Sequence, residues 1–271
     1  MKGLLFGGCS FTWGQGLYFY SDLSRLVYPE SEYTYNGKEI NDAHIKFKDT
    51  IRFPRLVANH FKTFEVFKNI NGGSEDETFN FFKHIFTDRD KQLHISYEKY
   101  NYDDFEFMII QLSQMFRNFF YYKLDGKTMS SNATPWSDYQ DMTNLLKWME
   151  VNNKTNDDWV NELKKQQIER LIKELNFYEE KGIKTLIFPW ENEIINELKS
   201  IEFLNSRLVN LTYDNKNFDS IFDLQNEYKN MKIKYDYESF DGAPPEDHHP
   251  SKLCHEVIAN SIIKHIENKF L

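Results

Sequence analysis

A serine follows the first apolar run of the chain, where a catalytic hydroxyl could be presented. Residues 3–6 are mostly apolar, Gly7 and Gly8 come directly after them, and Ser10 follows. This pattern predicts a short buried strand, a tight turn and a serine at the carboxyl end of the strand. Open α/β sheets bind their ligands at that edge. The Ser10 hydroxyl could therefore act as a nucleophile once a base accepts its proton, or it could simply cap the turn.

The other end of the chain carries acids and histidines close together. Residues 246–250 are Glu-Asp-His-His-Pro, and the proline holds the backbone of His249 extended. Asp247 or Glu246 can contact the imidazole ring of His249 and fix its tautomer. A serine near the start and an acid with a histidine near the end are the components of a hydrolytic triad. The plainer interpretation is a loop with surface histidines.

The same cluster offers donors for a metal ion. These donors would be Asp247, His248, His249, Cys254 and His255. Their spacing matches no standard zinc pattern, so we expect no metal site here.

Two further segments place polar groups directly after apolar runs. Gly72 and Gly73 follow the second run and would expose backbone N–H groups to a ligand. Ser74 and Glu77 also have the spacing of a capping box, so an ordinary strand-to-helix turn explains the same residues. Residues 111–114 (Gln-Leu-Ser-Gln) follow the third run, and their side chains would face the same crevice or merely end a strand.

The elements that must position these residues alternate along the chain. The runs predicted as strands are residues 3–6, 64–67, 107–112, 185–188 and 208–211. The segments predicted as helices are residues 53–61, 75–86, 157–180 and 251–270. Gly182 is expected to stop the third of these helices, and Ser251 to cap the last one. Such alternation predicts an α/β fold with a parallel sheet and right-handed crossovers.

The length and charge of the chain limit the possible functions. A chain of 271 residues suits one large domain, and we expect a single domain over residues 1–271 with insertions around 17–50 and 121–156. Its net charge of −9 argues against a nucleic-acid or anionic-membrane partner. The two cysteines make no disulfide framework, and no run is apolar enough for a signal peptide or a membrane span. We therefore expect a cytoplasmic protein.

These segments, in this order, resemble the blocks of the SGNH (GDSL-like) hydrolase superfamily. Residues 8–14 (GCSFTWG) are similar to the family's GDSxxxG block, with Cys9 in place of the aspartate. Gly73 matches the glycine of the second block, and residues 246–251 (EDHHPS) resemble the Asp-x-x-His-Pro block. The GCSFTxG form and the abundant Asn, Lys, Phe and Tyr are similar to members from phages and AT-rich bacteria, so the protein could also be virion-associated.

Two positions depart from the pattern of the family. Its third block, Gly-x-Asn-Asp, supplies an asparagine to the oxyanion hole, and this chain has no asparagine there before Asn118. Loss of such a donor costs about 10²–10³ in turnover, unless another side chain substitutes. The usual spacing makes Glu246 the triad acid, whereas a shorter Asp-x-His-Pro form favours Asp247, which we prefer.

The resemblance implies a fold and a mechanism. The fold would be a three-layer α/β/α sandwich around a mostly parallel five-stranded sheet of the flavodoxin-like SGNH type. Ser10 would attack an ester carbonyl, His249 would carry its proton, and Asp247 would orient the ring. The Ser10 and Gly73 N–H groups would stabilise the oxyanion. The candidates for the remaining oxyanion donor are Gln111, Ser113 and Gln114.

The resemblance also implies the class of partner. The substrate would be a small-molecule or carbohydrate ester, with O-acetyl groups on carbohydrate as the leading candidate, and no cofactor would be needed. Two alternatives stay open. The first is a weakly active or inactive glycan-binding or virion-associated module of the same fold. The second is an acyltransferase that uses the same triad.

Overall fold

Strands and helices alternate in space as they do in the sequence, and the computed structural model describes most of the chain. The described residues are 1–9, 12, 49–67, 74–87, 100–131, 139–234 and 246–271. Ser10, Gly73 and nearly all of the predicted insertion at 17–50 lie outside them. The backbone of residues 246–248 is described, but their side chains are not.

Four parallel strands form the central sheet, in the order β2-β1-β3-β6. They are β1 (Gly3–Gly7), β2 (Glu65–Phe67), β3 (Phe105–Leu112) and β6 (Lys184–Pro189). Strand β1 lies inside the sheet and is buried along its whole length, which explains its continuous apolar sequence. The predicted α/β class is confirmed, and so are the first four predicted strands.

The helices of the described chain are α4 (Phe53–His60), α5 (Glu75–Phe86), α6 (Tyr139–Val151), α7 (Asn156–Glu180), α8 (Ile195–Ser200), α9 (Glu202–Asn205), α10 (Ile221–Glu227) and α11 (Lys252–Phe270). Four of them, α4, α5, α7 and α11, match the predicted helical segments to within one residue at each end, and the others were not predicted. Ser74 and Glu77 form the predicted capping box of α5. Gly182 follows α7 with a φ of 84°, and Ser251 caps α11 by accepting a hydrogen bond from the Cys254 N–H.

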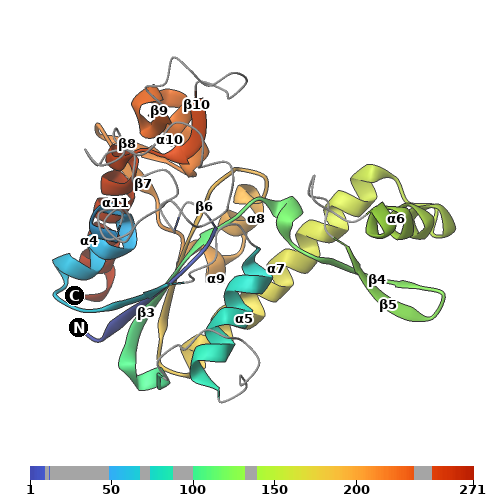
Figure 1. Ribbon diagram of the computed structural model, residues 1–271, viewed down its shortest axis with the longest axis horizontal. Coiled ribbons are helices and arrows are strands. Elements are labelled where there is room, and N and C mark those ends of the chain that lie inside the picture. Colours follow the sequence, from blue (N-terminus) through green and yellow to red (C-terminus); the bar gives the residue numbers. More distant parts are fainter. Residues whose placement is uncertain (10–11, 13–48, 68–73, 88–99, 132–138, 235–245) are drawn as a thin grey trace, which may run out of the picture.

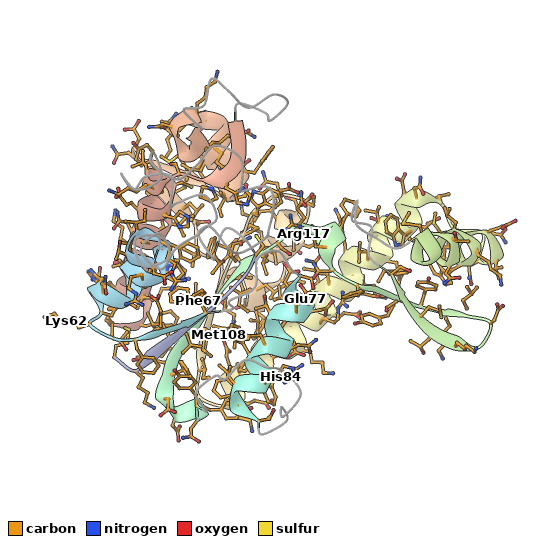
Figure 2. The ribbon with its side chains drawn as sticks, in the orientation of Figure 1. Lys62, Phe67, Glu77, His84, Met108 and Arg117 are labelled. Atoms are coloured by element: carbon orange, nitrogen blue, oxygen red, sulfur yellow. The ribbon has the colours of Figure 1, made fainter. Side chains whose placement is uncertain are left out.

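Helices cover both faces of the sheet because successive strand residues point to opposite sides. Leu4 and Phe6 of β1 pack in one core cluster with residues of α4 and α11. Leu5 of β1 and Met108 of β3 pack in the other cluster with residues of α5 and α7. Figure 1 shows these helix pairs on either side of the sheet, and Figure 2 shows the side chains that fill the space between them. The arrangement is that of an α/β sandwich.

The predicted strand at 208–211 does not form a full fifth strand. Leu208 makes a single parallel bridge with Ile187 of β6, and then β7 (Leu211–Tyr213) pairs with β8 (Lys216–Phe218) instead. Asp214 and Asn215 make the tight turn of this hairpin with φ angles of 50° and 59°. Because this hairpin takes the chain out of the sheet, the described part of the sheet has four strands rather than the five expected.

The segment predicted as an insertion at 121–156 forms an arm. It contains the hairpin of β4 (Phe120–Leu124) and β5 (Lys127–Ser131), followed by α6. Figure 1 shows this arm extending sideways from the sheet. Its base is fixed to α7, because the Tyr121 N–H donates to Gln166 Oε1 at 2.9 Å and Gln166 Nε2 donates back to the Tyr121 carbonyl at 2.8 Å.

Short elements complete the described chain. They are the 3₁₀ turns η2 (Tyr102–Asp104), η3 (Met115–Arg117) and η4 (Lys229–Met231), and the antiparallel pair of β9 (Lys232–Lys234) and β10 (Glu246–Pro250). In the part of the chain that the structure describes, no helix combines the length and the apolar composition needed to cross a membrane.

The turn after β1 generates a first prediction. Gly8 and Gly126 both have positive φ, 151° and 77°. A Cβ on Gly8 would lie 2.2 Å from Thr12 Oγ1 and 2.9 Å from Gln111 Oε1, whereas one on Gly126 would meet nothing within 4 Å. Gly8→Ala should therefore lower the free energy of unfolding by about 1–3 kcal/mol more than Gly126→Ala, measured by urea denaturation. Equal losses would contradict the close approach at Gly8.

Candidate functional site

The topology of the sheet marks one position on its carboxyl edge. From β1 the chain crosses to β2 on one side, and from β2 it returns to β3 on the other side of β1. Ligands of open α/β sheets bind at such a switch point, outside the carboxyl ends of the strands. Here the switch point lies between the turn after β1 at Gly8 and Cys9 and the end of β3 at Ser113 and Gln114.

The side chain of Gln111 holds the turn that leads to Ser10. Its Oε1 atom accepts hydrogen bonds from Cys9 N at 3.3 Å, from Cys9 Sγ at 3.1 Å and from Thr12 Oγ1 at 3.4 Å. Its Nε2 atom donates to the Leu112 carbonyl at 2.6 Å. Gln111 was expected among the oxyanion donors, but its amide is buried and both ends of that amide bond to the protein.

Ser113 is joined to the first turn of α5. Its backbone N–H donates to Glu75 Oε1 at 2.7 Å, and its hydroxyl lies 3.4 Å from Glu75 Oε2. The Glu75 N–H donates in turn to Asn118 Oδ1 at 3.1 Å. These bonds link the chain that follows β2 to the chain that follows β3. They also engage the N–H of Ser113, another of the expected oxyanion donors.

Burial makes Glu75 an unusual acid. Glu75 is only 6% exposed. Desolvation raises the pKa of its carboxyl group to about 7, although hydrogen bonds from its own N–H, from Ser113 and from Asn118 act to lower it. The charge of Asp76 adds a smaller upward effect. A carboxyl that titrates near neutral pH at the carboxyl edge of a sheet is a mark of a functional site. Sequence analysis missed it, because Glu75 resembles an ordinary acid in the first turn of a helix.

A pair of acids follows β6 on the other side of β3. Gln114 Nε2 donates to Glu191 Oε1 at 3.1 Å. Partial burial, and next a hydrogen bond and charge repulsion from Glu191, raise the pKa of Glu193 to about 8. These acids were also missed, although a Glu-Asn-Glu sequence directly after an apolar run was a usable signal. Gln114 is partly exposed, and its amide nitrogen carries a second N–H beyond the one bound to Glu191.

The C-terminal cluster lies in an extended strand that is fixed at its end. Strand β10 pairs with β9, the Ser251 N–H donates to the Met231 carbonyl at 2.8 Å, and Ser251 Oγ donates to the Asn230 carbonyl at 2.7 Å. His249 is partly buried and lies two residues before this anchor. The structure thus holds His249 at the start of α11, whereas the side chains of the two candidate acids lie outside the described residues.

Cys254 and His255, two of the five possible metal ligands, are buried in the core and are not available to a metal ion at the surface. His255 Nδ1 accepts a hydrogen bond from Phe53 N at 3.1 Å, and the two rings stack at 5.6 Å between centroids. Burial, followed by the charges of Arg52 and His249, lowers the pKa of His255 to about 3. Cys254 is fully buried, and burial raises the pKa of its thiol. His255 therefore supports α4 as a neutral acceptor.

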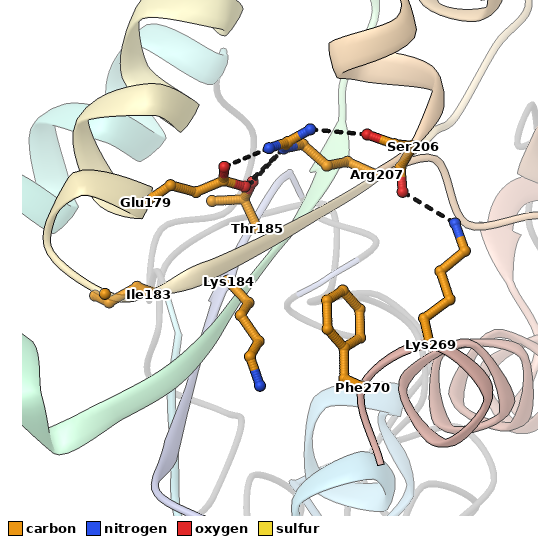
Figure 3. A pocket seen from close by; sticks show the side chains of 9 residues that line it. Glu179, Ile183, Lys184, Thr185, Ser206, Arg207, Lys269 and Phe270 are labelled. Atoms are coloured by element: carbon orange, nitrogen blue, oxygen red, sulfur yellow. Dashed lines mark hydrogen bonds and ion pairs between the residues drawn. The ribbon is translucent and has the colours of Figure 1, made fainter.

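A pocket of about 610 Å³ lies at the amino end of β6, on the edge of the sheet opposite the candidate site. Figure 3 shows how its polar side chains are engaged. Arg207 binds the Glu179 carboxylate through two of its nitrogen atoms, and Lys269 Nζ donates to the Ser206 carbonyl at 3.0 Å. Lys184 Nζ lies 3.3 Å from Glu106 Oε1. Because these cations already have partners, the pocket presents no free charge to a ligand among the described residues.

The structure therefore gathers several of the predicted site residues at one edge. Gln111, Ser113 and Gln114 lie there with the turn that precedes Ser10, and Glu75 and Glu191 join them. No family model, no curated protein and no solved structure matches this chain.

The burial of Glu75 generates a second prediction. Since its pKa is raised from 4.5 to about 7, the folded protein binds this proton more tightly than the unfolded chain does. The stabilisation from this group is fully present below pH 4.5 and is lost as the pH rises toward 7. That interval corresponds to roughly 3 kcal/mol.

Glu75→Gln removes this dependence. The free energy of unfolding of the variant, minus that of the wild type, should rise by up to about 3 kcal/mol between pH 4.5 and pH 8, measured by urea denaturation at each pH. Glu77→Gln is the matched control, because it removes another acid of the same helical turn and glutamine can still cap Ser74. A flat difference for Glu75→Gln would show that Glu75 is ionised throughout.

Proposed function

We propose that this protein is a serine hydrolase of the SGNH type that cleaves esters by acyl transfer to water. The observation that carries the proposal is the Gln111 side chain, which binds Cys9 and Thr12 on either side of Ser10 at the switch point of the sheet. Because ligands bind at this edge of open α/β sheets, the serine that follows Cys9 in the sequence is our candidate nucleophile. The late histidine and its neighbouring acids provide the rest of a triad.

The chemistry runs in two halves. Ser10 Oγ attacks the ester carbonyl carbon while His249 accepts the hydroxyl proton, and His249 then gives that proton to the leaving alcohol. Water next attacks the acyl-serine and loses a proton to His249, which gives that proton to Ser10 Oγ as the bond to the acyl group breaks and the acid leaves. Asp247 orients the imidazole in this scheme, and Glu246 is the alternative acid.

The oxyanion would be bound by the N–H groups of Ser10 and Gly73 and by one side chain. We assign that third donor to Gln114, because Gln111 is buried with its Nε2 donating to the Leu112 carbonyl and the Ser113 N–H donates to Glu75, whereas Gln114 is partly exposed. Its hydrogen bond to Glu191 fixes the amide, and the second N–H stays available. In this respect Gln114 would take the place of the family's asparagine.

The substrate class we propose is an O-acetyl ester on carbohydrate. The support is the arm after β3, which carries aromatic side chains and begins a few residues after Gln114. Tyr121 at its base is 44% exposed, and exposed aromatic rings are suited to stacking on sugar rings.

The nucleophile assignment gives a third prediction. Ser10→Ala should abolish hydrolysis of p-nitrophenyl acetate and labelling by a fluorophosphonate probe, because both reactions need the Ser10 oxygen. Ser200→Ala, which removes an exposed hydroxyl far along the chain, is the control and should keep full activity. Unchanged hydrolysis in Ser10→Ala would overturn the assignment.

The same assay separates the two alternatives. A wild-type protein that binds glycans but neither hydrolyses the ester nor reacts with the probe would be a binding module that retains the fold. A labelled protein that transfers acetyl to an added alcohol faster than to water would be an acyltransferase.

The triad acid gives a fourth prediction. Asp247→Asn should lower kcat by about 10⁴-fold with a small change in KM, because the imidazole loses the carboxylate that fixes its tautomer. Glu246→Gln is the matched control one residue away and should keep most of the activity. The reverse result would make Glu246 the acid.

A further inference from the structure

The end of β3 is held by a carboxyl group that the proposed chemistry does not use. Glu75 accepts from the Ser113 N–H at 2.7 Å, and its own N–H is held by Asn118 at 3.1 Å. Ser113 directly precedes Gln114, the proposed third oxyanion donor. The position of Gln114 therefore depends on a bond made by its neighbour to another element of the fold.

A small polar cavity lies behind this carboxyl group. Its volume is about 50 Å³, and its lining includes Glu75, Asn118, Gln167 and Arg170. Gln167 is 4% exposed, yet neither atom of its side-chain amide has a hydrogen-bond partner among the described residues, and Arg170 Nη2 also has none there. A cavity of this size with unpaired polar groups on its wall has room for water, since one molecule needs about 10–15 Å³ and two to four partners. Water there would let Glu75 exchange its proton without unfolding of the site.

The charges around the cavity come from two helices. Helix α5 contributes Asp76 and Lys83, and α7 contributes Arg170 and Glu174. Arg170 Nη1 lies 3.1 Å from Asp76 Oδ2, and Lys83 Nζ lies 2.6 Å from Glu174 Oε1. Since these groups pair with each other, no cation forms an ion pair with Glu75 among the described residues.

We propose that Glu75 is a positioning residue: its carboxylate holds Ser113 and so aims Gln114 at the crevice, and protonation of Glu75 weakens that hold. A charged acceptor makes a shorter and stronger hydrogen bond than a neutral one. The catalytic part of this inference rests on the proposed ester hydrolysis, whereas the hold on Ser113 does not. The site is therefore better ordered when Glu75 is ionised.

The hold on Ser113 can be measured without any substrate. In a nuclear magnetic resonance titration of the amide groups, the Ser113 N–H signal of the wild type should shift with a midpoint near pH 7. This titration should disappear in Glu75→Gln and persist in Glu77→Gln, which changes an acid of the same helical turn. A Ser113 signal that does not titrate, or that still titrates in Glu75→Gln, would overturn the proposal.

The effect on catalysis is read from the ratio of the variant kcat to the wild-type kcat, which cancels any pH effect that the two proteins share. The kcat of Glu75→Gln divided by that of the wild type should be close to one at pH 5.5 and should fall about fivefold by pH 8.5, with KM unchanged. Glu75→Leu, which offers no acceptor, should lose kcat at both pH values. A ratio that is constant with pH in an active wild type would overturn the positioning role.

The two failures can be told apart. If the wild type hydrolyses no ester but the Ser113 signal titrates through Glu75, the proposed function fails and the hold on Ser113 stands. If the wild type is active and Ser113 does not respond to Glu75, the hydrolase stands and this inference fails.

Discussion

The amide group of Gln111 joins the two central strands of the sheet at their carboxyl ends. Its oxygen accepts from Cys9 and Thr12, and its nitrogen donates to the carbonyl of Leu112. A buried amide that loses such partners costs about 1–3 kcal/mol for each unsatisfied group. The turn after β1 and the end of β3 therefore move as one unit, and everything proposed for this edge depends on their fixed separation.

Acids flank that unit on both sides: Glu75 is buried at the start of α5, and Glu193 is partly buried after β6. Desolvation is the main cause that raises the pKa of each of these two carboxyl groups. The ionised carboxylates of Glu75 and Glu193 would be better solvated in water, so placing them at this edge lowers the stability of the fold. Costs of this kind concentrate at functional sites. By contrast, the cations of the pocket at the amino end of β6 all have partners: Arg207 binds Glu179, Lys184 binds Glu106, and Lys269 donates to a backbone carbonyl.

Local sequence patterns predicted the four strands of the sheet and the helices α4, α5, α7 and α11, because each of these carried its own signal. The capping box of Ser74 and the stop at Gly182 are decided by residues a few positions apart. The predicted fifth strand at 208–211 was wrong, because the tight turn at Asp214 and Asn215 pairs the end of this apolar run with β8 instead of with the sheet. At the site, the inward orientation of Gln111 and the burial of Glu75 follow from β1 and α5 lying beside β3, and no single segment encodes that neighbourhood.

The arm after β3 leaves the sheet and returns through α7, and its base is tied to α7 by the reciprocal bonds between Tyr121 and Gln166. The hairpin and α6 therefore form a module whose length can vary while β3, α7 and the edge between them stay in place. During evolution the hairpin and α6 can be lengthened, shortened or replaced. Such changes would alter which molecules reach the edge of the sheet, while β3 and α7 keep their positions.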